Sequence, residues 1–384
     1  MPDLTVPAGG PARADVAHLD PVPLDAGLSA MALADPVLCA ELEQANLRAH
    51  EYLDEAKAES TRTRYEWDWK DWCGWCARYG ITPLPAAPQA VALYLGARAH
   101  TWAWSTVAGR LAAIAHYHHN AGLPSPTAHP LVLRIRSGIR RVNGVATAGK
   151  QPITPGQLAA MVAAVRTDQG RQPLARIRDP AILLLGFYAG RRRSELVAIS
   201  VNDLTLIDGE GLRIRIRRSK TDQEGRGRTI GVPYSPDPNL CPVRAVLAWC
   251  DAAGVSRYLG RRRDRAADVP LFRGLTKHGT LRAGRLTDRW VAILVKDAIA
   301  RAGLDLDLDD FSGHSLRVGL VSEAVEQGVS PIAIMKQTGH TRLATTSEYA
   351  RGSLFRDNAA AAIMAAATRD NRTTAGADDL PEGQ

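Results

Sequence analysis

The stretch from His314 to Tyr349 reads HSLRVGLVSEAVEQGVSPIAIMKQTGHTRLATTSEY, and it decides how the rest of the chain is interpreted. His314 and Arg317 are three residues apart, so they share one face of a helix. His340 and Tyr349 follow in the same stretch. A guanidinium grips phosphate oxygens, imidazoles donate hydrogen bonds or move protons, and a phenol can be a nucleophile. These side-chain types together indicate chemistry on a phosphate.

The charge of the chain points to an anionic partner. Its 384 residues carry a net charge of +8 with a pI near 9.4, which favours nucleic acid as the partner. No apolar run reaches the roughly 18 residues that a membrane-spanning helix requires, and the first residues lack the pattern of a signal peptide. We therefore expect a cytoplasmic protein, nucleoid-associated if bacterial, with no membrane partner.

Two small clusters have the residue types of a redox or metal site. Cys73 and Cys76 form a C-x-x-C pattern, but it lies inside a Trp-rich helical pattern rather than at a helix start after a strand. His116, His118 and His119 do not have the spacing of a clear i,i+4 metal pair. We expect buried small residues at the cysteines, and DNA contact or a packed polar face at the histidines. The five cysteines are odd in number and scattered, which argues against a disulfide framework.

The N-terminal part of the chain predicts a helical module after a flexible tail. Residues 1–35 lack stable periodicity, whereas apolar residues recur at helical spacing through residues 36–142. Ser60 is placed to cap one of these helices, which leaves Arg62 and Arg64 in its first turn, where the helix dipole disfavours cations. Either an external anion holds these arginines or they are solvated. The predicted helices span residues 36–59, 61–79, 88–99, 105–120 and 131–142.

A short polar segment divides the chain into two modules. The predicted helix over residues 131–142 is basic, which suits contacts with DNA phosphates. Residues 143–152 are mostly Gly, Ala and polar residues with little that could pack, so we interpret them as a linker. A larger module, residues 153–365, follows, and residues 366–384 are a polar tail. The arginines of the basic helix are Arg134, Arg136, Arg140 and Arg141.

The larger module opens with helices. Thr154 and Pro155 form an N-cap and N1 proline pair that begins a helix. Residues 179–189 are strongly apolar and predict a buried helix that ends at Gly190. An arginine cluster is therefore positioned at the end of a buried helix. It reads Arg191-Arg192-Arg193-Ser194-Glu195.

A strand pattern follows. Residues 212–217 alternate apolar residues with arginine, which predicts a strand with one apolar and one cationic face. Residues 228–232 predict a second strand, so Lys220 lies at or near the tip of a hairpin that could enter or flank a groove of DNA. The predicted fold class is mainly α, with a helical N-terminal domain and an α+β C-terminal domain that has a small antiparallel sheet. Further helices are predicted over residues 155–166, 242–253, 286–302 and 359–367.

The chain resembles the tyrosine recombinase (phage integrase) family, with a Cre- and Xer-like layout. H-x-x-R alone is frequent by chance, but the family's motifs occur here in order and at fitting spacings over about residues 60–365. The resemblance implies that residues 36–142 are a DNA-binding core-binding domain and residues 153–365 the catalytic domain. The motifs are Gly190 to Leu196, Lys220 before Thr221, His314 to Arg317, Gly339-His340 and Tyr349.

Attack on a phosphodiester places negative charge on the non-bridging oxygens, and the predicted site supplies donors for it. Arg192 and Arg317 can clamp these oxygens, and His340 can donate to one of them. Glu195 is expected to orient Arg192 or Lys220. The family often has an apolar residue where this chain has Arg191, so the choice of Arg192 depends on counting back from Ser194, Glu195 and Leu196.

The remaining candidate residues move the proton and make the bond. Tyr349 is the predicted nucleophile, and His314 is the candidate acceptor of its proton because a phenol has a reference pKa of about 10. Lys220 is the candidate acid for the leaving 5′-oxygen. The product is a 3′-phosphotyrosine link and a free 5′-hydroxyl. Because the bond energy is conserved, no cofactor, ATP or metal is expected.

By this resemblance the protein is a site-specific DNA recombinase for integration, excision or resolution. The resemblance implies double-stranded DNA with inverted-repeat half-sites, a homotetramer across two sites and strand exchange through a Holliday junction. The alternative is a type IB topoisomerase-like DNA-relaxing enzyme, which shares the chemistry. A non-catalytic DNA-binding protein and a metal-dependent nuclease are further alternatives. For the nuclease the Asp-rich residues 304–310 are better interpreted as a connection, because they lack the Gly and Glu of a calcium loop.

Overall fold

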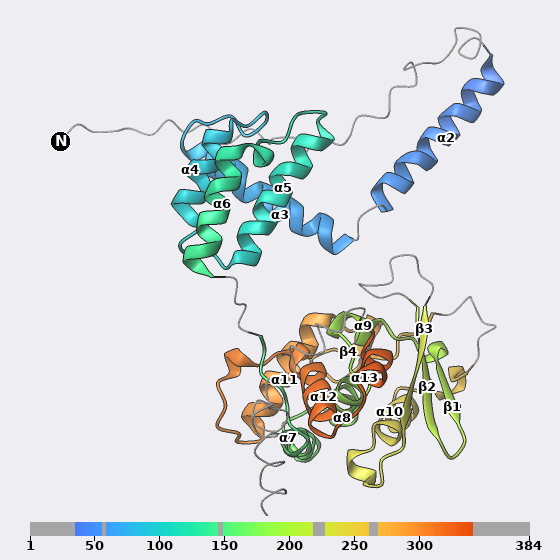
Figure 1. Cartoon of the computed structure of the whole chain (residues 1–384). Coiled ribbons are helices and arrows are strands. Elements are labelled where there is room, and N and C mark those ends of the chain that lie inside the picture. Colours follow the sequence, from blue (N-terminus) through green and yellow to red (C-terminus); the bar gives the residue numbers. More distant parts are fainter. Residues whose placement is uncertain (1–34, 56–58, 145–148, 218–226, 261–267, 341–384) are drawn as a thin grey trace, which may run out of the picture. The chain divides into compact units, whose positions relative to one another are not determined.

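The chain divides into two compact units, Met1–Ala148 and Gly149–Gln384 (Figure 1). Both units are rich in helices, and the second also contains small antiparallel sheets, so the predicted fold class is confirmed. Within the described residues, none of the helices is both long enough and apolar enough to cross a membrane. The computed structural model describes residues 35–55, 59–144, 149–217, 227–260 and 268–340.

The helices of the first unit follow the predicted pattern, and proline begins several of them. Pro88 and Pro130 each occupy a first helical position, where the missing N–H costs nothing and the fixed φ suits the helix. The predicted cap at Ser60 is wrong, because the helix already begins at Glu59. The helices are α2 (Pro36–Glu55), α3 (Glu59–Arg78), α4 (Pro88–Arg98), α5 (Trp104–Asn120) and α6 (Pro130–Asn143).

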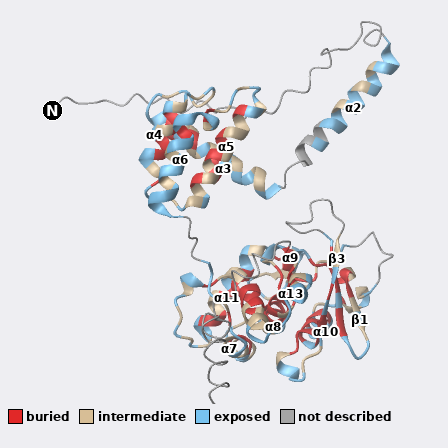
Figure 2. Ribbon diagram, viewed as in Figure 1, coloured by how far each residue is buried: buried red, intermediate tan, exposed pale blue. Residues whose placement is uncertain are grey.

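An aromatic cluster forms the core of the first unit. The rings of Trp72 and Trp75 on α3 and Tyr94 on α4 have centroids 5.1 to 5.7 Å apart. Trp72 donates from Nε1 to the carbonyl of Pro83 (3.1 Å), and the Tyr94 hydroxyl donates to Asp71 (2.6 Å). Both buried rings therefore have partners for their polar atoms. Figure 2 shows the buried residues of this unit on α3, α4 and α5.

The cysteine and histidine clusters contribute to packing. Burial raises the pKa of Cys73 to about 11 and that of Cys76 to about 12, so both remain thiols at neutral pH. His118 is fully buried between the Ala86 amide, which donates to Nε2 (2.8 Å), and the Ile114 carbonyl, which lies 2.8 Å from Nδ1. The prediction of a packed polar face is confirmed for this histidine.

Arg64 is exposed but its guanidinium contacts the rest of the unit. Its Nη2 donates to the carbonyl of Ser105 on α5 (2.9 Å), and its Nε lies 3.5 Å from a carboxylate oxygen of Asp68. The side chain is 54% exposed, which agrees with the solvated alternative, but the contacts with Ser105 and Asp68 were not predicted. Because α3 begins at Glu59, Arg64 lies beyond its first turn, and its hydrogen bond to Ser105 links α3 to α5.

Helix α8 (Pro173–Tyr188) is the centre of the second unit. It is buried continuously from Arg178 to Phe187 and packs against α7, α10 and α12. It begins at Pro173 rather than at the predicted Asp179, and it ends before Gly190, whose φ of +60° suits glycine. The helices around it are α7 (Pro155–Thr167), α9 (Arg193–Ala198), α10 (Pro242–Ala252), α11 (Asp288–Arg301), α12 (Gly313–Glu326) and α13 (Pro331–Thr338).

The predicted hairpin is part of a three-stranded antiparallel sheet in the order β1-β2-β3. On β2 the apolar residues are buried while Arg213 and Arg215 are exposed, as the alternation predicted. β1 and the β4–β5 pair were not predicted, because strands this short show little alternation. The strands are β1 (Leu204–Ile207), β2 (Gly211–Ile216), β3 (Arg228–Pro233), β4 (Arg273–Leu275) and β5 (Leu281–Arg285).

The segment interpreted as a linker is attached at both ends. The side chain of Asn143, the last residue of α6, donates to the carbonyl of Ala99 (2.7 Å). At the other end the amide of Gln151 donates to the carbonyl of Asp310 (2.9 Å). Residues 145–148 lie outside the described part of the chain. The last residues of the segment therefore belong structurally to the second unit.

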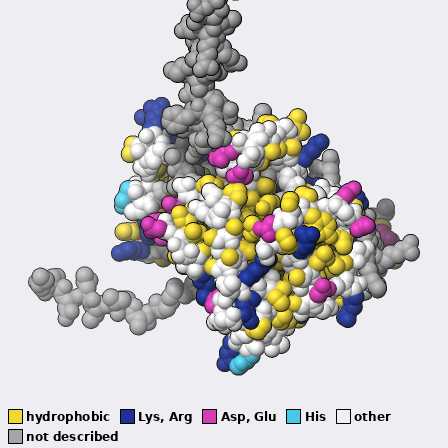
Figure 3. Space-filling model, turned by 90° about the horizontal axis from the view of Figure 1, so that it is seen from below, with side chains coloured by type: hydrophobic (Ala, Val, Ile, Leu, Met, Phe, Trp, Pro, Cys, Tyr) yellow, Lys and Arg dark blue, Asp and Glu magenta, His cyan; other side chains and the backbone are white. Residues whose placement is uncertain are grey.

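Charged side chains of both signs share one face of the molecule (Figure 3), whereas α6 carries only arginines among its charged residues. On the face shown in Figure 3, Lys and Arg side chains alternate with Asp and Glu side chains around apolar patches. The basic helix α6 is different, because its arginines are exposed on one helix. A phosphate-binding surface on the first unit is therefore expected at α6, as the sequence predicted. The exposed arginines of α6 are Arg134, Arg136, Arg140 and Arg141.

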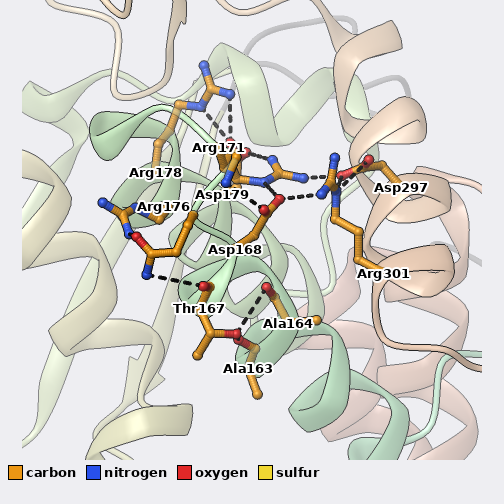
Figure 4. A network of polar contacts seen from close by, with 12 residues as sticks. Ala163, Ala164, Thr167, Asp168, Arg171, Arg176, Arg178, Asp179, Asp297 and Arg301 are labelled. Carbon is orange, nitrogen blue, oxygen red and sulfur yellow. Dashed lines mark hydrogen bonds and ion pairs between the residues drawn. The ribbon is translucent and has the colours of Figure 1, made fainter.

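A network of ion pairs crosses the N-terminal half of α8 (Figure 4). Asp179 is fully buried, and its carboxylate pairs with Arg178 (2.7 Å) and with Arg171. Arg171 also pairs with Asp297 of α11, which in turn binds Arg301 (2.8 Å). Arg171 therefore joins α8 to α11, because it pairs with the fully buried Asp179 of α8 and with Asp297 of α11. A buried charge is tolerated only with such partners.

We predict that Asp179→Asn lowers the free energy of unfolding by about 3 kcal/mol, because it leaves two arginines beside a neutral amide in a buried place. The measurement is chemical or thermal unfolding of the full chain. Asp309→Asn is the matched control, since Asp309 forms a solvent-exposed pair with Lys296 and its loss should hardly change the melting temperature. Equal stability of Asp179→Asn and the wild type would contradict the role of the network.

Candidate active site

The turn after α8 presents Arg192. Gly190 ends the buried helix, and Arg192 takes the extended N-cap position of α9 with φ −64° and ψ 148°. Its Nη1 donates to Oε1 of Glu195 at 2.6 Å, and about a quarter of its side chain is exposed. Glu195 itself is buried. Arg192 is thus oriented by a fixed carboxylate and still reaches the surface of the unit, which agrees with the expected role of Glu195.

Arg191 points inward. It is 1 % exposed, and its Nε donates to the carbonyl of Ala189 (2.9 Å) while its Nη2 donates to the carbonyl of Gln337. Its Nη1 lies 3.5 Å from Oε2 of Glu195. Burial and the neighbouring Arg228, Arg317 and Arg192 lower the pKa of Arg191 to about 9 against the favourable effect of Glu195. This placement supports the choice of Arg192 as the residue that faces a ligand.

Helix α12 presents His314 and Arg317. Ser312 caps this helix, and its hydroxyl accepts from the His314 amide (3.2 Å). Arg317 is 1 % exposed, and its Nη1 donates to the carbonyls of both Gly190 and Thr338 at 2.7 Å. The guanidinium therefore lies between the end of α8 and the end of α13, next to the residues that follow each of these helices.

His340 follows the end of α13. Gly339 has φ +75° and ψ 35°, the left-handed conformation that ends a helix and favours glycine. The Thr338 hydroxyl donates to the carbonyl of Ile334 (2.7 Å) and lies 3.1 Å from Nδ1 of His340. His340 is buried. Its imidazole is therefore held against the last turn of α13 from the Nδ1 side.

The arginines and the two histidines of the site lie close enough to shift one another's pKa values. Burial, followed by Arg317, Arg192 and Arg193, lowers the pKa of His314. Burial, followed by Arg317, Arg192 and His314, lowers the pKa of His340 to about 4. Both imidazoles are neutral at neutral pH. The site is thus a cluster of guanidinium groups with neutral imidazoles beside them, an arrangement that can receive an anion.

Two candidate residues cannot be placed. Lys220 and Tyr349 lie outside the described residues. The base of the hairpin that carries Lys220 is described, because Ile216 of β2 pairs with Arg228 of β3. Arg228 donates from Nη2 to the carbonyl of Thr338 (2.8 Å), so the base of the hairpin lies beside the end of α13.

The structure thus brings together Arg192, Glu195, His314 and Arg317 with His340. Sequence reasoning missed Arg228, which no local motif distinguishes from other strand arginines, and it assigned no role to Thr338. The Thr-Gly-His order could have indicated a helix end, because glycine commonly follows the last helical turn. In the described part of the chain, no group of three or more His, Cys, Asp and Glu side chains is arranged to hold a metal ion.

We predict that stability falls as the pH drops from about 6.5, the ordinary pKa of histidine, towards the value of about 4 for His340 in the folded chain. In this range the unfolded chain binds more protons than the folded chain, so acid favours unfolding. The measurement is denaturant unfolding at several pH values. His340→Phe should flatten the dependence, and an identical slope for this variant and the wild type would contradict the prediction.

Comparison with known proteins identifies the family. Residues 151–354 match the Phage integrase family. The chain is 36% identical over 321 residues to an integrase/recombinase XerD homolog of Selenomonas ruminantium. This alignment covers 83% of this chain and 89% of that protein. The chain is 27% identical over 305 residues to the recombinase Cre of Escherichia phage P1, covering 73% and 81%. A crystal structure of a lambda integrase dimer bound to a core site has a TM-score of 0.49 at 14% identity, covering 79% of this chain and 75% of that chain. The family resemblance drawn from the motifs is confirmed, and the chain belongs to the phage integrase family of tyrosine recombinases.

Proposed function

We infer that this chain is a site-specific DNA recombinase that cleaves and rejoins double-stranded DNA through a 3′-phosphotyrosine intermediate. The observation that carries this function is the convergence of Arg192, His314, Arg317 and His340 from three separate elements on one place. The relatives named above are recombinases, which favours this function over a topoisomerase-like relaxing activity.

The arginines act on the charge that develops during the reaction. Arg192 is oriented by Glu195, and Arg317 is fixed by two carbonyls, so neither has to reorganise when phosphate arrives. Donors that are held in place stabilise the transition state more than mobile ones. His340 adds a hydrogen bond to a non-bridging oxygen. Because the bound phosphate offsets the arginine charges, it raises the pKa of this imidazole and favours donation from Nε2.

The reaction moves two protons, one from the Tyr349 hydroxyl and one to the leaving 5′-oxygen. The Tyr349 oxygen attacks phosphorus, a Tyr–phosphate bond forms, and the bond to the 5′-oxygen breaks. His314 takes the phenolic proton, because burial and then the nearby arginines lower the pKa of its imidazole and leave it neutral and able to accept. Lys220 gives a proton to the leaving 5′-oxygen. These two roles at Tyr349 and Lys220 follow from the family's motifs in the sequence, and rejoining reverses the steps with a 5′-hydroxyl as the nucleophile.

The assembly follows from the same family membership. We propose that protomers bind inverted-repeat half-sites, that four protomers join two sites, and that strands are exchanged through a Holliday junction. In the DNA-bound protomer, residues 36–142 act as the core-binding domain, with the exposed arginines of α6 on phosphates. Residues 153–365 act as the catalytic domain. The protein then works where chromosomal or phage DNA lies, in the cytoplasm and at the nucleoid of a bacterial cell.

We predict that Tyr349→Phe abolishes the covalent protein–DNA adduct, because the nucleophilic oxygen is absent. The substrate is a nicked half-site from which cleavage releases the short fragment that carries the free 5′-hydroxyl, so the adduct accumulates and is counted on a denaturing gel. Tyr258→Phe is the control and should form the adduct at the wild-type rate. An undiminished adduct with Tyr349→Phe would refute the assignment of the nucleophile.

We predict that Arg192→Lys slows cleavage by at least about 100-fold, because a point charge cannot replace a planar fork on the phosphate. DNA affinity should change little, since most affinity comes from contacts along the backbone. Arg193→Lys is the matched neighbour. Arg193 pairs with Asp288 (3.0 Å) on the surface, so this variant should keep most of the cleavage rate. Similar losses in both variants would count against the distinct role of Arg192.

A further inference from the structure

Three guanidinium groups hold the C-terminal end of α13. The carbonyl of Thr338 accepts from Arg317 (2.7 Å) and from Arg228 (2.8 Å), and the carbonyl of Gln337 accepts from Arg191. The last carbonyls of a helix lack partners within the helix and carry partial negative charge, so cations stabilise them. The proposed mechanism uses Arg317 on the phosphate, and Arg191 contacts Glu195. It gives no role to Arg228.

Arg228 also covers the residue before His340. A Cβ atom on Gly339 would lie 1.8 Å from Nη1 and 2.1 Å from Cζ of Arg228. The guanidinium thus fills the space that a side chain at position 339 would need. Glycine is favoured at position 339 by its left-handed backbone, and Arg228 packs against it. The backbone on both sides of the Thr338–Gly339 peptide is therefore in contact with one side chain.

The other end of Arg228 is fixed by the sheet. Arg228 is the first residue of β3 and pairs with Ile216, the last residue of β2. Ile230, two residues further along β3, is buried in the core and sets the register of the strand. The side chain of Arg228 is therefore a strut between the sheet and the turn that carries His340. In this way a side chain of β3 links the base of the hairpin to the end of α13.

The positive charge of Arg228 is repelled by a neighbouring arginine, which disfavours folding. It lies close to Arg191, and this neighbour is among the causes that lower the pKa of that buried guanidinium. Like charges at short range oppose folding. Arg228 makes its contacts with Thr338 and Gly339 in spite of this repulsion, as is typical where function and stability conflict.

We propose that Arg228 is a positioning residue for His340, which holds the Thr338 carbonyl and the Gly339 backbone so that the imidazole stays beside Arg192 and Arg317. This role rests on the proposed recombinase function. Arg228 acts through His340 and not on the scissile phosphate. Its loss lets the turn after α13 move, and the hydrogen bond from the imidazole to the phosphate oxygen is weakened.

The first test compares Arg228→Met with Arg244→Met. Arg244 is the matched control because it is also an arginine whose Nη1 donates to a backbone carbonyl, that of Ser235 (3.1 Å), but it lies on α10. At saturating protein on the nicked half-site, adduct formation should slow by about 10- to 100-fold in Arg228→Met, while DNA affinity equals that of the control. Equal cleavage rates in the two variants, or a loss confined to affinity, would overturn the proposal.

The second test is a double-mutant cycle with His340→Phe. If Arg228 acts through His340, the double variant cleaves at about the rate of His340→Phe alone, since the imidazole that Arg228 positions is already absent. If the fold-loss of cleavage rate in the double variant equals the product of the losses in the two single variants, the proposal is overturned, because Arg228 would then act on something other than His340. A general loss of folding would not produce this pattern.

A third variant covers the case in which Arg228→Met does not fold. Arg228→Lys keeps the charge and can reach the Thr338 carbonyl, but it leaves Gly339 uncovered. We expect an intermediate cleavage rate and the same lack of additivity with His340→Phe, and additive losses here too overturn the proposal. If the wild type forms no adduct at all, the recombinase function itself fails and this inference with it. If the wild type forms the adduct and the Arg228 variants form it at the same rate, this inference is refuted while the recombinase function stands.

Discussion

The position of the Arg317 guanidinium sets the geometry of the whole site. Arg317 is buried, and its Nη1 donates to the carbonyls of Gly190 and Thr338. A buried cation is expensive unless its donors are paired, so these two carbonyls stabilise it where it lies. They belong to the turn after α8 and to the end of α13. Arg192 and His340 each lie two residues beyond one of these carbonyls, so Arg317 contributes directly to the spacing between them.

The same arrangement explains the electrostatics of the site. Several guanidinium groups are assembled before any phosphate is present, and burial together with their positive charge lowers the pKa of His314 and of His340. The repulsion between the arginines is offset by helix-end carbonyls and by Glu195, which contacts both Arg191 and Arg192. A bound phosphate relieves the remaining repulsion, and this relief is greatest when its negative charge is greatest. Preorganised charge of this kind suits phosphoryl transfer to a tyrosine.

Local sequence patterns predicted most of the described helices and the hairpin, because their signals are local, but they did not predict the short helices α9 and α13. Thr154 is the N-cap, as predicted, and also forms a capping box with Gln157, and Gly190 ends the buried helix as expected. The pattern failed where an element is short or where a distant partner changes the outcome. β1 spans only Leu204–Ile207, and α8 continues back to Pro173 because Arg171 and Arg178 neutralise Asp179 inside the helix.

By itself the sequence determined the family and the chemistry, since the order and spacing of the motifs around Arg192 and from His314 to Tyr349 are readable without coordinates. Only the tertiary structure decided which of three consecutive arginines turns inward and which reaches the surface. It also decided that Arg228 of a strand supports the turn before His340. The reason is physical. Burial and hydrogen-bond partners depend on residues more than a hundred positions away, such as the 127 that separate Arg317 from Gly190, and no local pattern encodes them.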